Sequence, residues 1–391
     1  MEKYMEELKM QLRGFDEELA SEIISDYEQH FIEGRLEGKS DSEIISELGS
    51  IDDMIDGLKE THAFNQREES MNVDVKEDNI GVLDEEKKMS DNDNLGKIIT
   101  NSFCKQLILD ADIANVEIKT SNTDKVEIIY ENKGGKSQLK KFKFYSYEKD
   151  DILYAGVKKV TRGLDLFGSI IRGDVKVKLM LPKDMKDVTI TTKVGDIDCI
   201  NAIAERIDMS ALSSDISVSN MNANTIMLNT KAGDIELNNV IAKELGIKAS
   251  SGDVDIENVT ISDNTDIALL SGDVSVDNMN NNIIKLNTAS GDIDCDNIAY
   301  NYGKFDTASG DVRLEINKHK ETVCKSGCGD VYIKLQNSNG ITLGVTTGCG
   351  DANVYWGKDK QKCLRNGFYT YGLGEEKVTI QTGTGDIKIS R

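Results

Sequence analysis

The sequence has few of the residues that most often mark a catalytic or metal-binding site. Its 391 residues include three His, one Trp and one Pro, and no two His have the spacing of metal ligands. Neither Gly38-Lys39-Ser40 nor Gly135-Lys136-Ser137 follows the upstream Gly that a phosphate loop needs. No Gly-x-Ser-x-Gly elbow occurs. We therefore expect a protein that is not an enzyme and that has no cofactor and no metal site.

Long apolar runs are also missing. No run approaches the roughly 18 residues of a membrane-spanning helix, and the charged residues 1–7 lack the apolar core of a signal peptide. We expect a cytoplasmic protein without a direct membrane span. The formal charge is −22, and residues 1–96 hold 28 acidic against 10 basic side chains. Such a chain is a poor candidate for binding nucleic acid.

The sequence does contain a long internal repeat, a Gly-Asp-(Val/Ile) signature spaced about 19 residues apart. A fixed period of about 20 residues is typical of a stacked fold in which each repeat contacts its neighbours. One further copy, Gly385-Asp386-Ile387, lies near the end of the chain. The signature aspartates of the main run are Asp196, Asp215, Asp234, Asp253, Asp273, Asp292, Asp311, Asp330 and Asp351.

Each repeat predicts two short strands and two turns. The first and third residues after the aspartate are apolar, as in Val254 and Ile256, and a second alternation follows, as in Leu245, Ile247 and Ala249. The fold class is therefore mainly β, a parallel β-solenoid of about 19 residues per coil. The fifth residue after the aspartate is Asn in six copies: Asn201, Asn220, Asn239, Asn258, Asn278 and Asn297.

The Gly, Asp and Asn that recur from repeat to repeat are interpreted as a structural turn ladder, a stack of equivalent turns. Gly before the aspartate permits positive φ, Asp can hydrogen-bond the backbone two residues on, and Asn tolerates the left-handed conformation. Stacked Asn amides can also bond to one another along the stack. The alternative is a calcium ladder of the Gly-Gly-x-Gly-x-Asp type, but the period differs and the additional glycines are missing.

The seven cysteines fit a reducing compartment. Cys199 and Cys295 occupy apolar positions of the repeat, and Cys324 is expected to point inward. Cys328 and Cys349 occupy the same position in two coils that the sequence predicts to be adjacent, so their spacing permits a disulfide. A reducing compartment would keep both thiols reduced. Cys324, Cys328 and Cys349 with nearby His319 form an alternative zinc set.

The chain divides into three predicted parts. Residues 1–64 form a helical module, with a capping-box pattern at Ser40-Asp41-Ser42-Glu43. Residues 65–96 are an acidic linker without periodicity. Residues 97–391 form the solenoid, in which we expect a cap and first coils over 97–192, regular coils over 193–351 and a C-terminal cap over 352–391. The aromatics Tyr355, Trp356, Phe368, Tyr369 and Tyr371 are expected to close the core at that end.

Two resemblances follow from these motifs. Asp26-Tyr27-Glu28-Gln29-His30-Phe31 and Ile44-Ile45-Ser46-Glu47-Leu48-Gly49 resemble the bacterial HAAS signalling domain. That family often precedes membrane segments and accompanies PadR-type regulators. The Ser251-Gly252-Asp253-Val254 turns and the strand ending in Leu181-Pro182 resemble the bacterial "putative adhesin" family of β-strand repeats, whose function is unknown. The second resemblance implies a β-solenoid over residues 97–391.

The leading functional hypothesis is a non-enzymatic bacterial signalling or scaffold protein. Its helical module would bind a protein partner, through which the chain could associate peripherally with a membrane, and its solenoid would present an interaction surface. The alternatives are a surface adhesin exported by a non-standard route and a carbohydrate-active β-helix enzyme. The enzyme alternative requires a basic or aromatic cluster on the same face as the Asp and Glu side chains that point outward from the coils, and the sequence alone shows none.

Overall fold

The computed structural model describes residues 2–12, 24, 27, 31, 35, 39–48, 51, 55, 97–133, 142–159, 175–357, 359–361 and 364–391. The chain divides into two compact units. One comprises residues 1–93 and 161–170, and the other comprises residues 94–160 and 171–391. The predicted linker, residues 65–96, lies outside the described residues. In the part of the chain described, no helix is long and apolar enough to cross a membrane.

The described residues of the first unit are largely helical and have their own core. The helices with described bounds are α1 (Glu2–Gln11) and α3 (Asp41–Leu48). The capping box forms, since Ser40 N–H donates to Glu43 Oε2 at 2.8 Å and Glu43 N–H donates to Ser40 Oγ at 3.4 Å. The described buried side chains form a single cluster: Met5, Leu8, Leu12, Tyr27, Phe31, Ile44, Ile51 and Ile55.

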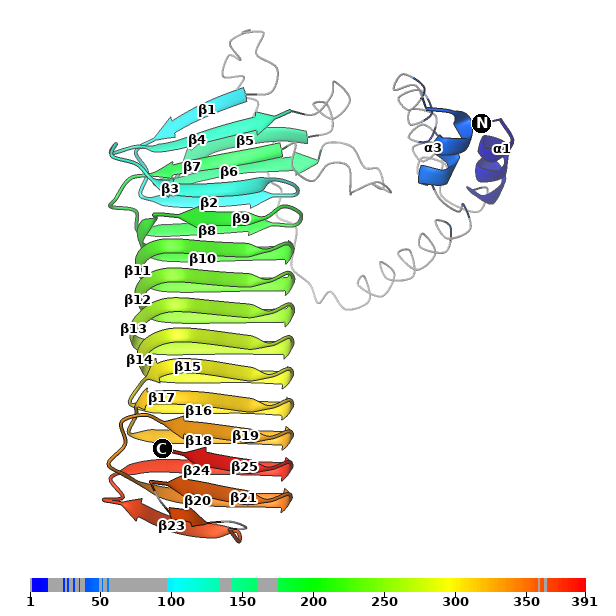
Figure 1. Cartoon of the computed structure of the whole chain (residues 1–391). Helices are drawn as coiled ribbons and strands as arrows, with labels where there is room; N and C mark the ends of the chain where they lie inside the picture. The colour runs from blue at the N-terminus through cyan, green and yellow to red at the C-terminus, as the bar shows by residue number, and fades with distance from the viewer. Residues whose placement is uncertain are drawn as a thin grey trace, which may run out of the picture. The chain divides into compact units, whose positions relative to one another are not determined.

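The second unit is a stack of parallel coils, in which one coil consists of two strand segments and two turns (Figure 1). Its regular middle is built from long strands that bend at the repeated asparagines. Parallel partners follow the repeat, so Ile216 pairs with Ile235, Ile235 with Val254, and Val254 with Val274. These strands are β10 (Ile203–Ser213), β11 (Ile216–Ala232), β12 (Ile235–Ser251), β13 (Val254–Ser271) and β14 (Val274–Ser290).

At the N-terminal end the order of the coils in space differs from their order in the sequence. β2 pairs with both β6 and β8, and β3 pairs with both β7 and β9, so the β2–β3 coil lies between two later ones. β1, β4 and β5 add antiparallel pairings at this end. The strands are β1 (Lys97–Ser102), β2 (Gln106–Ala111), β3 (Asn115–Thr120), β4 (Val126–Asn132), β5 (Phe142–Lys149), β6 (Ile152–Lys159), β7 (Val175–Leu181), β8 (Asp187–Thr192) and β9 (Ile197–Ile200).

The C-terminal end repeats this arrangement and corrects the predicted cap over 352–391. β24 lies between β18 and β20, and β25 lies between β19 and β21, so the last residues form an inserted coil (Figure 1). The strands are β15 (Ile293–Ala299), β16 (Tyr302–Ser309), β17 (Val312–Lys318), β18 (Glu321–Cys328), β19 (Val331–Leu335), β20 (Gly340–Cys349), β21 (Ala352–Trp356), β22 (Asp359–Gln361), β23 (Gly367–Gly372), β24 (Glu376–Thr384) and β25 (Ile387–Ser390).

One continuous aliphatic core runs through the stack. Ile256 is 2% exposed and lies between Leu237 and Val276 of the neighbouring coils. Trp356, Tyr369 and Tyr371 pack against this core at the C-terminal end, as predicted. Phe368 does not, because its side chain is 83% exposed.

Candidate functional site

The repeated aspartates form a ladder of hydrogen bonds between coils. Asp234 N–H donates to Asp215 Oδ1 at 2.9 Å, and Asp253 N–H donates to Asp234 Oδ1 at 2.8 Å. The ladder passes through the inserted coil, since Asp386 N–H donates to Asp330 Oδ1 and Asp351 N–H to Asp386 Oδ1. The expected bond to the backbone two residues on is therefore wrong. The carboxylates from Asp196 to Asp330, and that of Asp386, instead tie one turn to the next, which fits a structural role.

The repeated asparagines adopt the left-handed conformation that their residue type suggests. Their φ angles lie between 51° and 57° in Asn201, Asn220, Asn239, Asn258, Asn278 and Asn297. The expected amide ladder is present in the second half, where Asn278 Nδ2 donates to Asn258 Oδ1 at 3.3 Å and Asn297 Nδ2 donates to Asn278 Oδ1 at 2.5 Å. Like the aspartates, these side chains are engaged in holding turns together.

The predicted proximity of Cys328 and Cys349 is wrong, because both pair with Thr384 of the inserted coil, one on each side. Two interstrand spacings separate them by roughly 9.5 Å, which is too far for a disulfide. Cys199, Cys295 and Cys324 are buried, and burial raises the pKa of the Cys199 thiol to about 12. The described residues contain no group of His, Cys, Asp and Glu that could hold a metal.

The inserted coil also creates a cluster that the sequence does not show. Lys388 Nζ lies 5.0 Å from the ring centroid of Tyr332 and 5.7 Å from that of Tyr355, and the Arg313 guanidinium lies 5.9 Å from Tyr332. These cation–π contacts join β17, β19, β25 and β21 across the insertion. This basic and aromatic cluster does share a face with outward aspartates, as the enzyme alternative requires. Side chains of the chain itself, however, lie over the tyrosine rings. We interpret the cluster as a set of contacts that holds the inserted coil in place.

A second network joins the inserted coil to its neighbour through buried polar groups. Tyr300 Oη lies 2.8 Å from Thr322 Oγ1, which lies 2.9 Å from His319 Nδ1. On the other side of the imidazole, Nε2 lies 3.3 Å from Glu376 Oε2. This order of carboxylate, imidazole and hydroxyl resembles an activated nucleophile, but Thr322 is 0% exposed. A substrate cannot reach it, so the network is structural.

This network predicts a dependence of stability on pH. Burial lowers the pKa of His319 below its ordinary value of 6.5, and the Glu376 carboxylate only partly opposes the shift. The unfolded chain therefore takes up a proton at a higher pH than the folded chain. Stability should fall as the pH drops below about 6.5, by at most about 1.4 kcal/mol per pH unit for one proton. Denaturant unfolding followed by the fluorescence of Trp356, the single Trp, reports this. His319→Asn should lose less stability than the wild type between pH 7 and 5, and equal losses would contradict the assignment.

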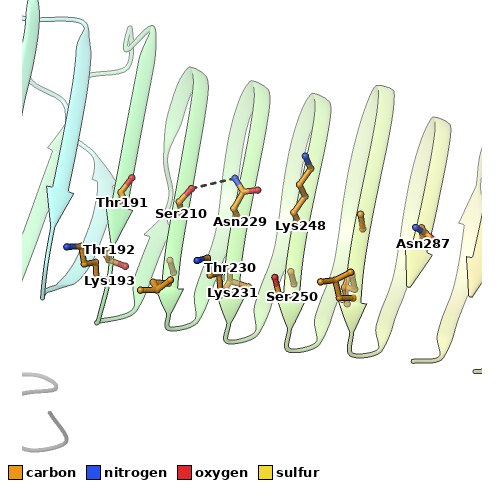
Figure 2. A pocket seen from close by; sticks show the side chains of 16 residues that line it. Thr191, Thr192, Lys193, Ser210, Asn229, Thr230, Lys231, Lys248, Ser250 and Asn287 are labelled. Atoms are coloured by element: carbon orange, nitrogen blue, oxygen red, sulfur yellow. Dashed lines mark hydrogen bonds between the residues drawn. The ribbon is translucent and has the colours of Figure 1, made fainter. Parts of the chain in front are cut away.

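The strongest candidate for a binding site is a groove on the outer face of the second strand segments. It has a volume of about 650 Å³ and crosses β8 and β10 to β14 (Figure 2). Among the described residues that line it there is no Asp or Glu. We call it the lysine–leucine groove, formed by Thr191, Thr192, Lys193, Ser210, Ala211, Leu212, Asn229, Thr230, Lys231, Lys248, Ala249, Ser250, Ala268, Leu269, Leu270 and Asn287.

Stacking builds the groove from residues that occupy equivalent positions in successive coils. The pairing register aligns one exposed position of five coils in a single row. Each residue of this row lies three positions before a signature aspartate: Lys193, Leu212, Lys231, Ser250 and Leu270. Leu212 is 42% exposed and Leu270 is 66% exposed, about 14 Å apart at three interstrand spacings. Reading the residue three positions before each signature aspartate reveals this row in the sequence. The row was missed because each side chain alone resembles an ordinary exposed residue.

The charges of the groove are distinctive in a chain of formal charge −22. Lys193 Nζ lies 2.9 Å from Asp112 Oδ1. Lys231 and Lys248 are exposed, and within the described residues neither has a carboxylate within ion-pair distance. The groove therefore combines two uncompensated cations with two exposed leucines. Lys231 lies between the leucines in their row, and Lys248 pairs with Ala268 in the adjacent row.

Comparison with known proteins supports both resemblances. Residues 104–268 and 262–390 match the family described as Toastrack DUF4097, and residues 3–56 match HAAS. No curated protein matches the chain.

Solved structures match about three quarters of this chain at low sequence identity. A "putative adhesin" from Bacteroides fragilis NCTC 9343 is 15% identical, with a TM-score of 0.32 over 75% of this chain and 96% of that one. A "putative adhesin" from Parabacteroides merdae ATCC 43184 is 10% identical, with a TM-score of 0.38 over 76% and 97%. A "Putative lipid binding protein" from Parabacteroides distasonis ATCC 8503 is 12% identical, with a TM-score of 0.38 over 76% and 97%. Scores this low carry no argument about function.

Proposed function

The chain belongs to the Toastrack DUF4097 family, and from that premise we propose that it is a non-enzymatic bacterial signalling or scaffold protein. In this proposal the HAAS-like module binds one protein partner, and the lysine–leucine groove binds an extended acidic segment of another. The observation that carries the proposal is the groove itself, whose described lining has no Asp or Glu and includes two lysines without a described carboxylate at ion-pair distance, on an acidic chain. Charge complementarity therefore favours an anionic partner.

The shape of the groove supports an extended segment. Each strand in the middle of the stack already pairs with a neighbour on both sides, so its backbone groups are not available for strand addition. Recognition must use side chains, with apolar residues of the partner against Leu212 and Leu270 and its carboxylates near Lys231 and Lys248. Five interstrand spacings from β8 to β14 span about 24 Å, which equals the length of about seven extended residues.

The proposal also places the protein in the cytoplasm. The described cysteines are all free thiols, as proteins of a reducing compartment usually keep them. The HAAS-like unit has its own buried core, which supports a separate binding module.

The proposed groove can be tested with a defined probe, a fluorescein-labelled octapeptide that alternates Leu with Glu. Fluorescence anisotropy should show saturable binding to the full chain, because the probe offers both apolar and anionic side chains. The variant Lys231→Glu with Lys248→Glu should weaken binding at least tenfold, which corresponds to about 1.4 kcal/mol. High salt should weaken binding to the wild type, since the lysines are exposed.

A matched control keeps the net charge change and moves it to positions outside the groove lining. Lys285 and Lys325 are exposed on the same outer face but do not line the groove. Lys285→Glu with Lys325→Glu should change the dissociation constant less than threefold. An equal loss in both double variants would mean that the probe senses net charge only. Absence of saturable binding to the wild type would overturn the proposal.

A further inference from the structure

β23 is an open edge at the C-terminal end of the stack. Among the described strands it pairs only with β20 (Figure 1). Its six residues, Gly367-Phe368-Tyr369-Thr370-Tyr371-Gly372, contain no charge and no Pro. Edge strands of soluble proteins are usually protected by charged side chains or proline, because free N–H and C=O groups recruit further strands.

The direction of the backbone groups follows from one hydrogen bond. Leu373 N–H donates to Asn339 O at 3.2 Å, and antiparallel partners alternate along a strand between bonded and non-bonded pairs. Tyr371 and Tyr369 therefore direct their backbone groups toward β20. Phe368, Thr370 and Gly372 direct theirs outward, away from the sheet.

The opposite end of the same sheet is built differently. On the face that carries β23, the edge strand at that end is β5, which pairs with β6 and carries exposed Lys143, Glu148 and Lys149. Charges of this kind oppose further strand pairing. The other face ends there in β1, which pairs with β4. Head-to-tail stacking of β23 on β5 would bury these charges against an uncharged strand, so a pairing of β23 with itself is favoured over a fibre.

We propose that β23 pairs antiparallel with β23 of a second copy of this chain around a two-fold axis at Thr370. In this register Thr370 faces its own copy, and Phe368 faces Gly372 of the partner. Aromatic side chains pack well over glycine in cross-strand pairs. The fold already uses this pairing once, since Phe368 lies across from Gly344 on β20, with its ring 3.0 Å from where a Gly344 Cβ would be. The 83% exposure of Phe368 leaves most of its ring available to the partner.

Sedimentation equilibrium of the full chain tests the pairing. The wild type should show a concentration-dependent monomer–dimer equilibrium without larger species. Thr370→Lys places two like charges opposite each other and should weaken the dimer at least tenfold. Gln381→Lys adds the same charge to β24 within the same sheet, where Gln381 is exposed, and should leave the equilibrium unchanged. Unchanged Trp356 fluorescence in both variants shows that the fold persists.

Oxidative cross-linking identifies the strand register. Thr370→Cys should form a disulfide-linked dimer, because directly opposed residues of a bonded antiparallel pair have Cα atoms about 5.5 Å apart. Gln381→Cys should show only the background from the native cysteines. A monomeric wild type overturns the proposal. So does a dimer that persists in Thr370→Lys and does not cross-link through Thr370→Cys, since that dimer must use another surface.

Discussion

Ile256→Asp should unfold the β unit or destabilise it by about 4 kcal/mol or more. Ile256 is 2% exposed and packs between Leu237 and Val276, so the new carboxylate would lie among aliphatic side chains without a hydrogen-bond donor. An unpaired charge in such surroundings is among the most costly single changes. Urea unfolding followed by Trp356 fluorescence gives the free energy directly.

The neighbouring residue supplies the control. Asp255 lies on the same strand one position earlier and is exposed, between Glu236 and Ser275 of the adjacent coils. Asp255→Lys should change stability by less than about 0.5 kcal/mol, because a surface substitution there neither opens a cavity nor buries a charge. If Asp255→Lys proved the more damaging of the two, the inward and outward faces would have been assigned with the wrong parity.

Gly272→Ala should have the second largest effect, about 3 kcal/mol. Its φ of +129° lies where side chains are strained. A Cβ there would also lie 2.0 Å from the carbonyl oxygen of Gly252 in the preceding coil. That oxygen belongs to the stacked backbone and cannot move without separating two coils. The strain and the overlap together should exceed the cost of a typical single substitution.

Gly357→Ala separates backbone strain from stacking. Gly357 also has a positive φ, +61°, but apart from its chain neighbours no atom of the described residues lies within 4 Å of a Cβ added there. Alanine should therefore cost only the left-handed penalty, about 1 kcal/mol. Equal losses in the two alanine variants, measured by urea unfolding, would show that close stacking of the turns contributes nothing.

The periodic part of the fold could be predicted from the sequence because every repeat has the same pattern of apolar residues and turn residues. Apolar residues at alternate positions, such as Val254 and Ile256, fix the face of each strand, and Asn258 fixes the turn through its backbone preference. The order of the end coils in space could not be predicted. Residues 376–390 have the same apolar alternation and Gly-Asp turn as the other coils, and this pattern does not specify which coils they lie between. The erroneous proximity of Cys328 and Cys349 followed directly from assuming that order.

The candidate site could be predicted only in part. The repeat puts Lys231, Ser250 and Leu270 at one position of successive coils, but it does not show that a groove forms beside them. The buried contact of His319 with Glu376 likewise depends on the inserted coil. The hydrogen bonds that the ladder aspartates accept were missed because the next coil supplies the donors.

The central claim, that the lysine–leucine groove recognises an acidic partner, is tested most directly by a charge swap. The wild type and the variant Lys231→Glu with Lys248→Glu are each titrated with two octapeptides, one alternating Leu with Glu and one alternating Leu with Lys. The wild type should prefer the acidic peptide and the variant the basic one, each by at least tenfold. If the variant keeps the preference of the wild type, the lysines of the groove do not select the ligand and the claim is wrong.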